Sequence, residues 1–132
     1  MGADGGIGGT YAVMPELFLK ADALVRAGDL ETAREIQFAM NEIIYTMCGS
    51  RANLYAVMKE ILKRKGVNVG GVRAPLTPVS ESDLPVVEHS MAMIDAAIEK
   101  YKRLLKCNKT TYNEYYRLYC NFSEVHDKMD MR

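Results

Sequence analysis

The chain has 132 residues and a mass of 14.8 kDa, enough for one domain with a hydrophobic core but hardly for two. Its 17 Lys and Arg balance 17 Asp and Glu, so the net charge of zero indicates neither a nucleic acid nor an anionic membrane as a partner. No apolar run approaches the roughly 20 residues that span a bilayer.

The chain opens with a glycine-rich stretch, GADGGIGGTYAV, in which five of the ten glycines lie within residues 1–9. Residues 5–13 have β character and predict a strand, although a lone strand has no partner for its ladder. The glycines could form a phosphate-binding loop, a flexible terminus, or a strand end where a ligand approaches the backbone closely. No strand precedes the glycines and no Lys-Ser/Thr pair follows them, which disfavours the phosphate loop. The β character disfavours the flexible terminus.

Three helices are predicted next, with apolar residues at helical spacing that define their core faces. The first has Pro15 in its first turn and Gly28 as its stop. The second begins at the N-cap Asp29 and ends at Gly49, and the third is capped by Ser50 and ends in the basic run KRKG. The expected core residues are Leu17, Leu24 and Val25 in the first helix, Leu30, Ala33, Ile36, Met40, Ile43, Ile44 and Met47 in the second, and Leu54, Val57, Met58, Ile61 and Leu62 in the third.

Two glycines and two prolines interrupt the helical spacing in VNVGGVRAPLTPVSESD, which predicts an ordered loop. Ser80 or Ser82 then opens a further helix, with Pro85 in its first turn. The apolar face of this helix comprises Val86, Val87, Met91, Ile94, Ala97, Ile98 and Leu104. After it, four of the eight tyrosines lie between Tyr112 and Tyr119, in a polar end that we expect to fray.

The three cysteines, Cys48, Cys107 and Cys120, form no CxxC pair and cannot all pair with one another. The first residues also lack the positive and apolar regions of a secretory signal. We therefore expect a reduced, cytoplasmic protein. The two histidines, His89 and His126, are not spaced with the cysteines like zinc ligands, so no metal site is expected.

Residues 2–37 resemble the late part of the N-acetylneuraminate lyase branch of the dihydrodipicolinate synthase family, whose eighth barrel strand carries a GADGGIGSTY-type segment. The downstream GVRAPLTPVSESDLPVV is similar to the family's Arg-x-Pro-Leu-x-Pro loop, and the resemblance extends to about residue 103. It implies that the chain, mostly α as it stands, is the C-terminal fragment of a (β/α)8 TIM barrel. The last barrel strand and helix are then expected at 1–28, a C-terminal helical extension at 29–105, and a divergent Tyr-rich tail at 106–132.

The resemblance also implies a substrate-binding segment at the end of the glycine-rich strand, where TIM barrels carry their chemistry. By the family pattern, Ile7 and Gly8 line the pocket beside the pyruvate moiety. Gly9 stands where the bacterial lyases usually have a serine that contacts the sugar part. Because Thr10 would point to the other face of a strand, it is a poor substitute for that hydroxyl.

The lyases of this branch cleave N-acetylneuraminate reversibly to N-acetylmannosamine and pyruvate, through a lysine Schiff base. Their lysine, their proton-relay tyrosine and their carboxylate-binding segment belong to earlier strands, which have no counterpart in this sequence. The nine lysines lie on predicted helices, mostly on polar faces, or in the tail: Lys20, Lys59, Lys63, Lys65, Lys100, Lys102, Lys106, Lys109 and Lys128. We therefore expect no catalytic residue, no metal and no cofactor in this chain, and no activity from it alone.

Two functions remain open at this point. The chain is lyase material, active on a small 2-keto acid only in a complete barrel formed with a complementing N-terminal half, or it is a helical oligomerisation or interaction module left from such an enzyme. The second function, and the uncovered face of the first helix, predict a homo-oligomer. A gene fragment, an internal start and a split enzyme are compatible origins, and the divergent tail favours a degraded or rearranged gene. A free-standing phosphate-binding protein is the least favoured alternative.

Overall fold

The computed structural model describes residues 5–102 of the chain. These residues fall almost wholly within one compact unit, Met1–Tyr101. They form two short 3-10 helices and four α-helices: η1 (Gly9–Ala12), α1 (Pro15–Ala27), α2 (Leu30–Cys48), α3 (Leu54–Arg64), η2 (Glu81–Asp83) and α4 (Leu84–Lys102). The expectation of a mostly α chain is therefore confirmed for the described residues, none of which lies in a strand. The predicted tail at 106–132 lies outside them.

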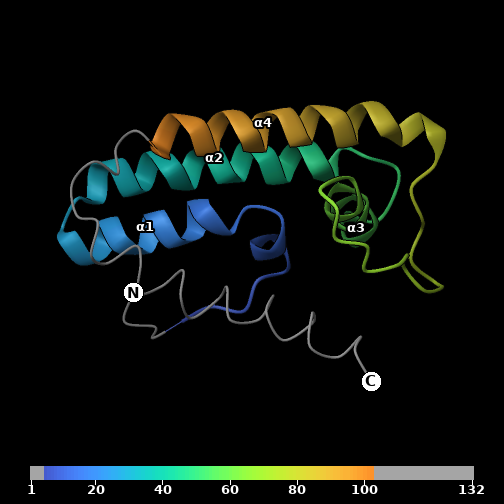
Figure 1. Ribbon diagram of the computed structural model, residues 1–132, viewed down its shortest axis with the longest axis horizontal. Coiled ribbons are helices and arrows are strands. Elements are labelled where there is room, and N and C mark those ends of the chain that lie inside the picture. The colour runs from blue at the N-terminus through green and yellow to red at the C-terminus, as the bar shows by residue number, and fades with distance from the viewer. Residues whose placement is uncertain (1–4, 103–132) are drawn as a thin grey trace, which may run out of the picture. The chain divides into compact units, whose positions relative to one another are not determined.

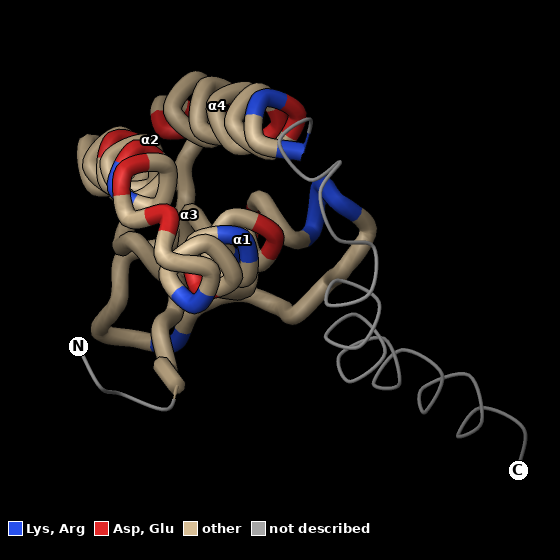
Figure 2. The backbone as a smooth tube through the Cα atoms, turned by 90° about the vertical axis from the view of Figure 1, so that its left-hand side faces the viewer, with Lys and Arg blue, Asp and Glu red and all other residues tan. Residues whose placement is uncertain are grey.

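The helices form a small bundle with one crossing member (Figure 1). α1 and α2 pack directly against each other in opposite directions, and α4 runs opposite to α2. Figure 1 shows α3 nearly end-on, so it crosses the other three helices at a steep angle. The view in Figure 2, turned by 90°, shows acidic and basic residues distributed over all these helices rather than gathered on one.

Local sequence signals account for most of the helix boundaries. Pro15 occupies the first turn of α1, where its missing N–H costs no hydrogen bond. Gly28 ends α1 with a φ of 83°, a left-handed conformation that glycine adopts without strain. The Asp29 carboxylate then caps α2 by accepting a hydrogen bond from the Thr32 N–H at 3.1 Å. These predictions from the sequence are confirmed.

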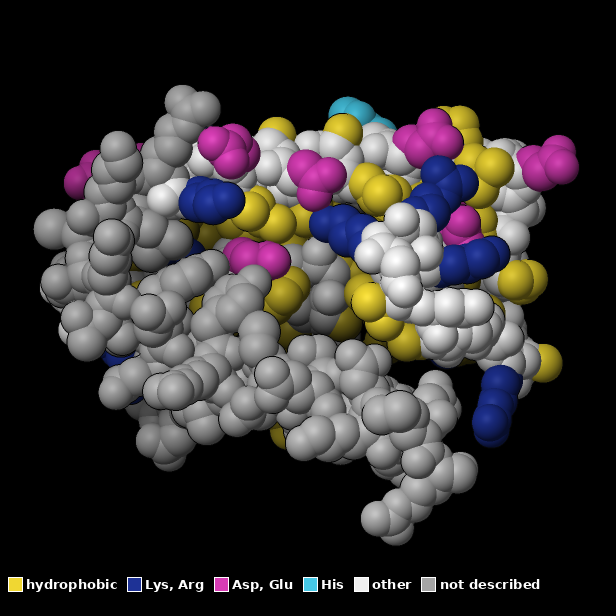
Figure 3. All heavy atoms as spheres, in the orientation of Figure 1, with side chains coloured by type: hydrophobic (Ala, Val, Ile, Leu, Met, Phe, Trp, Pro, Cys, Tyr) yellow, Lys and Arg dark blue, Asp and Glu magenta, His cyan; other side chains and the backbone are white. Residues whose placement is uncertain are grey.

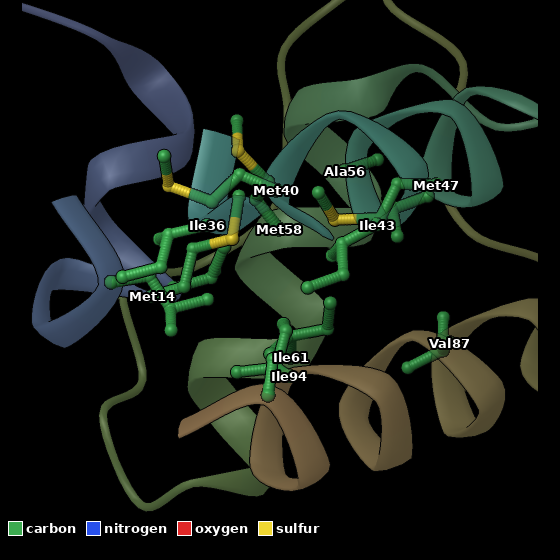
Figure 4. Close-up of a cluster of buried hydrophobic side chains, with 14 of the residues drawn as sticks. Met14, Ile36, Met40, Ile43, Met47, Ala56, Met58, Ile61, Val87 and Ile94 are labelled. Atoms are coloured by element: carbon green, nitrogen blue, oxygen red, sulfur yellow. The ribbon is translucent and has the colours of Figure 1, made fainter. Parts of the chain in front are cut away.

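A single hydrophobic core joins the four α-helices with Val13 and Met14, the two residues between η1 and α1 (Figure 4). In α2 the buried side chains recur at helical spacing, as predicted, whereas Leu30 at its start is exposed. The close-up shows Ile61 of α3 beside Ile94 of α4, which ties the crossing helix to the bundle. The fully buried large apolar side chains are Met14, Leu17, Ile36, Met40, Ile43, Met47, Val57, Ile61, Val87 and Ile94.

The predicted strand at residues 5–13 is wrong for this chain. Gly8 is extended, with φ −114° and ψ 139°, but the backbone turns into η1 from Gly9 onwards. The described residues offer no second strand, so an extended segment here would leave its N–H and C=O groups without a ladder. Instead Val13 and Met14 follow the turn into the helical core.

Two predicted details of the helices also differ from the structure. The N-cap of α3 is Asn53, whose side chain accepts from the Tyr55 N–H at 3.0 Å, and not Ser50. Val25 is half exposed, so the inner face of α1 runs through Leu17 and Lys20 instead. A lysine can occupy such a face because its aliphatic stem packs like an apolar side chain.

The loop between α3 and α4 is ordered as predicted, and one buried carboxylate joins its C-terminal end to the α2–α3 turn. Asp83 Oδ2 accepts hydrogen bonds from the Ser80 N–H at 2.9 Å and the Ser80 hydroxyl at 2.6 Å. Its Oδ1 accepts from the Ser50 hydroxyl at 2.8 Å and the Arg51 N–H at 3.0 Å. These bonds hold the pKa of Asp83 well below its usual range. The α2–α3 turn is thereby fixed to the start of α4.

Candidate functional site

The glycine segment, residues 5–9, is the candidate site because the resemblance places the substrate contacts there. Ile7 is fully exposed, with a relative accessibility of 108%, whereas Gly8 is half-buried and Gly9 begins η1. The turn is closed by a hydrogen bond from the Tyr11 N–H to the Gly8 carbonyl at 3.3 Å. The three predicted substrate-binding residues therefore lie at the surface, directly before the chain turns toward α1.

The ring of Tyr11 lies against two of these glycines. A Cβ atom on Gly6 would lie 2.5 Å from the Tyr11 hydroxyl oxygen, and one on Gly8 would lie 2.5 Å from a Tyr11 ring carbon. The Tyr11 ring in turn packs on Phe18 of α1, with 4.0 Å between the ring centroids. The close approach that glycine permits is thus made here by an aromatic ring of the same chain.

Gly9 makes a separate contact with α3. A Cβ atom built on Gly9 would lie 2.9 Å from Tyr55 Cε1 and 3.3 Å from Met58 Cε. Met58 is buried, whereas Tyr55 is 54% exposed. The Tyr55 ring therefore lies against the Gly9 backbone and keeps an open outer side.

Two sets of hydrogen bonds position α3 beside the glycine segment. The Asn53 side chain caps the helix, and the Asn53 N–H donates to the Thr77 carbonyl at 3.0 Å. The Asp83 carboxylate fixes the turn that precedes Asn53, through Ser50 and Arg51. Tyr55 thus stands two residues beyond an anchored helix start, and not on a free loop.

The described lysines lie on α-helices or, for Lys65, at the C-cap of α3, as expected, and most have a partner. Lys59 Nζ donates to the Gly71 carbonyl at 2.8 Å, and Lys65 Nζ donates to Asp95 at 3.1 Å. Lys20 differs because it is buried on the inner face of α1. Burial lowers the pKa of the Lys20 ammonium, and the negative charge of Asp29 partly offsets this effect.

A shallow groove of about 260 Å³ lies between α3 and the following loop, lined by both basic and acidic side chains, including Lys59, Glu60 and Lys63. None of its lining residues belongs to the glycine segment. Ion pairs from Arg64 to Glu88 and from Lys65 to Asp95 join α3 to α4. On the face shown in Figure 3, basic and acidic side chains accordingly alternate, with hydrophobic side chains between them.

Within residues 5–102 no group of His, Cys, Asp and Glu side chains is arranged to hold a metal ion, and Cys48 is an exposed free thiol. Cys107 and Cys120 lie outside those residues. No helix in the same part of the chain is both long and apolar enough to cross a membrane.

Sequence reasoning missed the contact between Tyr55 and Gly9 and the burial of Lys20. Neither has a local signal, since the first joins residues far apart in the chain and the second depends on what covers α1. The role of Asp83 did have one, because Ser80 and Asp83 have the Ser-x-x-acid spacing of a helix N-terminus.

The sequence profile of the Dihydrodipicolinate synthetase family matches residues 1–94. N-acetylneuraminate lyase of Mediterraneibacter gnavus is 48% identical over 102 residues, which cover 76% of this chain and 32% of that protein. N-acetylneuraminate lyase 2 of Escherichia coli O6:H1 is 38% identical over 87 residues, covering 65% of this chain and 28% of its own length.

A solved structure of wild-type Ruminococcus gnavus sialic acid aldolase superposes with a TM-score of 0.74 at 48% identity, covering 76% of this chain and 34% of that one. A solved structure of a catalytic lysine mutant of the same aldolase matches with the same TM-score, and the match includes 33% of that chain. The chain thus spans about a third of the length of the relatives it matches. Because the family profile matches most of its length, the chain belongs to the Dihydrodipicolinate synthetase family.

Proposed function

We propose that this chain supplies the C-terminal third of an N-acetylneuraminate lyase and acts in carbon–carbon cleavage only where the rest of a barrel is present. The observation that carries the proposal is the surface position of the glycine segment in a chain 48% identical to a lyase over 102 residues. Ile7 projects fully into solvent and has no packing role among the described residues. An exposed apolar side chain next to glycine residues is what we expect of one side of a substrate pocket that the remaining barrel strands would complete.

In the completed barrel, the chain's own residues would bind and orient the substrate, and the reacting lysine would come from the complementing part. Gly8 is extended, as a strand end requires, and a ligand could approach its backbone once the Tyr11 ring that lies against it moves aside. A lysine that attacks the keto carbon must be desolvated and must face the pocket. Among the described lysines only Lys20 is buried, and it lies on α1 and not at a strand end. The chain alone is therefore proposed to be inactive.

Trapping with borohydride and pyruvate tests this proposal. The chain is co-expressed with the part of the Ruminococcus gnavus aldolase that precedes the matched third, and intact masses of both polypeptides are measured after reduction. We expect a pyruvate adduct on the complementing polypeptide and none on this chain. The matched control takes the complementing part from the catalytic lysine mutant and is expected to give no adduct. An adduct on this chain by itself, or a stable complex without any adduct, would overturn the proposal.

The alternative function, a helical interaction module, is favoured by one observation. Phe38 and Tyr45 are exposed on α2 and lie seven residues apart, which places both on one side of the helix. A surface of this kind serves self-association without any need for the glycine segment. The two functions separate experimentally, because substitution of Gly8 would impair only the lyase and substitution of Phe38 only the module.

A further inference from the structure

We propose that Tyr55 of α3 is a specificity-determining residue of the completed site, and that its phenolic hydroxyl replaces the hydroxyl that Gly9 lacks. The inference rests on the proposed function and deepens it. It assigns the recognition of the polyhydroxylated part of the substrate to a side chain of the helical extension and not to the glycine segment.

Tyr55 lies in direct contact with Gly9. Because a Cβ atom at position 9 would lie 2.9 Å from Tyr55 Cε1, a serine could not occupy this position unless the tyrosine moved. The ring therefore fills the space that a side chain at position 9 would take. With the ring in this position, its phenolic end is the nearest side-chain source of a hydroxyl group on this side of Gly9, and a serine at position 9 would require the ring to rotate away.

Tyr55 has no packing role of the kind that Tyr11 has. Tyr11 also lies against glycines, but its ring stacks on Phe18 and so has a structural role. Tyr55 is 54% exposed and no ring stacking involves it in the described part of the chain. Its phenol can donate and accept a hydrogen bond, which suits a sugar hydroxyl.

The backbone of Tyr55 is anchored at the start of α3. Its own N–H donates to the Asn53 cap at 3.0 Å, and Met58, one turn further along α3, is buried against the same glycine. Only the ring of Tyr55 can move, by rotation of its side chain. A binding group on an anchored helix start loses little conformational entropy when it meets its ligand.

The test uses the chain complemented by the rest of the aldolase, with pyruvate and N-acetylneuraminate as separate probes. Tyr55→Phe removes only the hydroxyl, and Tyr45→Phe on α2 is the matched control at another exposed tyrosine. We expect Tyr55→Phe to raise KM for N-acetylneuraminate about three- to tenfold, the effect of one hydrogen bond, with the rate of pyruvate trapping unchanged. Tyr45→Phe is expected to change neither.

A double variant checks the exchange of hydroxyl groups directly. Tyr55→Ala removes the ring, and Gly9→Ser in that background returns a hydroxyl from the other side. We expect the serine to recover part of the affinity lost with Tyr55→Ala, whereas Gly9→Ser alone should impair the enzyme because serine and ring collide. A structural role for Tyr55 predicts no such rescue.

The outcomes distinguish the inference from the function on which it rests. If the complemented wild-type barrel gives no pyruvate adduct, the proposed function fails and this inference fails with it. If the adduct forms but Tyr55→Phe behaves like Tyr45→Phe, the inference alone is overturned.

Discussion

Ser90 in the middle of α4 should be a destabilising residue, and Ser90→Ala should make the protein more stable. The side chain is completely buried, and its hydroxyl oxygen has no hydrogen-bond partner. A buried polar group without a partner costs about 1–3 kcal/mol, because it has lost its bonds to water and gained none. Alanine is also the better helix former by roughly 0.5 kcal/mol.

The opposing effect is small. Removal of one oxygen atom leaves a void that, at about 24 cal/mol per Å³, costs only a few tenths of a kcal/mol. Ser90→Ala is therefore expected to raise the free energy of unfolding by about 1–3 kcal/mol, measured by urea unfolding of the full chain with far-UV circular dichroism. Ala96→Ser, at an exposed position of the same helix, isolates the propensity effect and should cost roughly 0.5 kcal/mol.

The reasoning is refuted if Ser90→Ala leaves the free energy of unfolding unchanged or lowers it. That result would mean that the hydroxyl has a partner in solution, such as a backbone carbonyl of the preceding turn, whose loss offsets the gain. A gain no larger than the loss in Ala96→Ser would show that helix propensity alone accounts for the change.

Three further predictions concern other buried or exposed groups. Asp83→Asn should lower the thermal midpoint by several degrees. Because the folded pKa of Asp83 is depressed, its contribution to the stability of the unsubstituted chain should be full above the unfolded pKa of about 4 and should be lost as the pH falls below it. A pH series of thermal melts measures this loss. Lys20→Met should raise the free energy of unfolding at neutral pH by on the order of 1 kcal/mol. Because burial lowers the folded pKa of Lys20, this gain should shrink as the pH rises through that pKa. A gain that stays constant with pH would contradict the burial of a charged Lys20. Phe38→Ser with Tyr45→Ser should shift the mass seen by light scattering toward 14.8 kDa, whereas an unchanged mass would show that the outer face of α2 is not the contact.

The helix boundaries that were predicted correctly depend on neighbouring residues alone. Pro15, Gly28 and Asp29 act within one turn of the backbone they terminate or cap, so their roles can be read from a short window. Ser50 could not be assigned in the same way, because both it and Asn53 are capable caps. The choice is made by Asp83, a residue 33 positions away that takes up the Ser50 hydroxyl.

In the candidate site, too, features that depend on neighbouring residues can be predicted from the sequence and features that depend on distant residues cannot. The density of glycines is enough to mark residues 5–9 as a candidate site in the sequence. The sequence does not predict which side chains lie against them, because Tyr55 reaches Gly9 only through the crossing of α3 over the bundle. Burial of Lys20 is likewise a tertiary effect, since helical spacing alone does not distinguish a lysine with a packed stem from a solvated one.

The predicted strand is absent because this chain alone determines the turn at Gly9, whereas a complete barrel would supply a pairing strand for residues 5–8. Gly8 already has extended dihedral angles, and the turn begins at the next residue, where Gly9 lies against Tyr55. What a strand at residues 5–8 lacks is therefore a ladder, which only another strand can supply. The turn itself depends on contacts within this chain, between η1, α1 and α3. Completion of a barrel would then change the pairing of the backbone before Gly9 and leave Tyr55 where it stands.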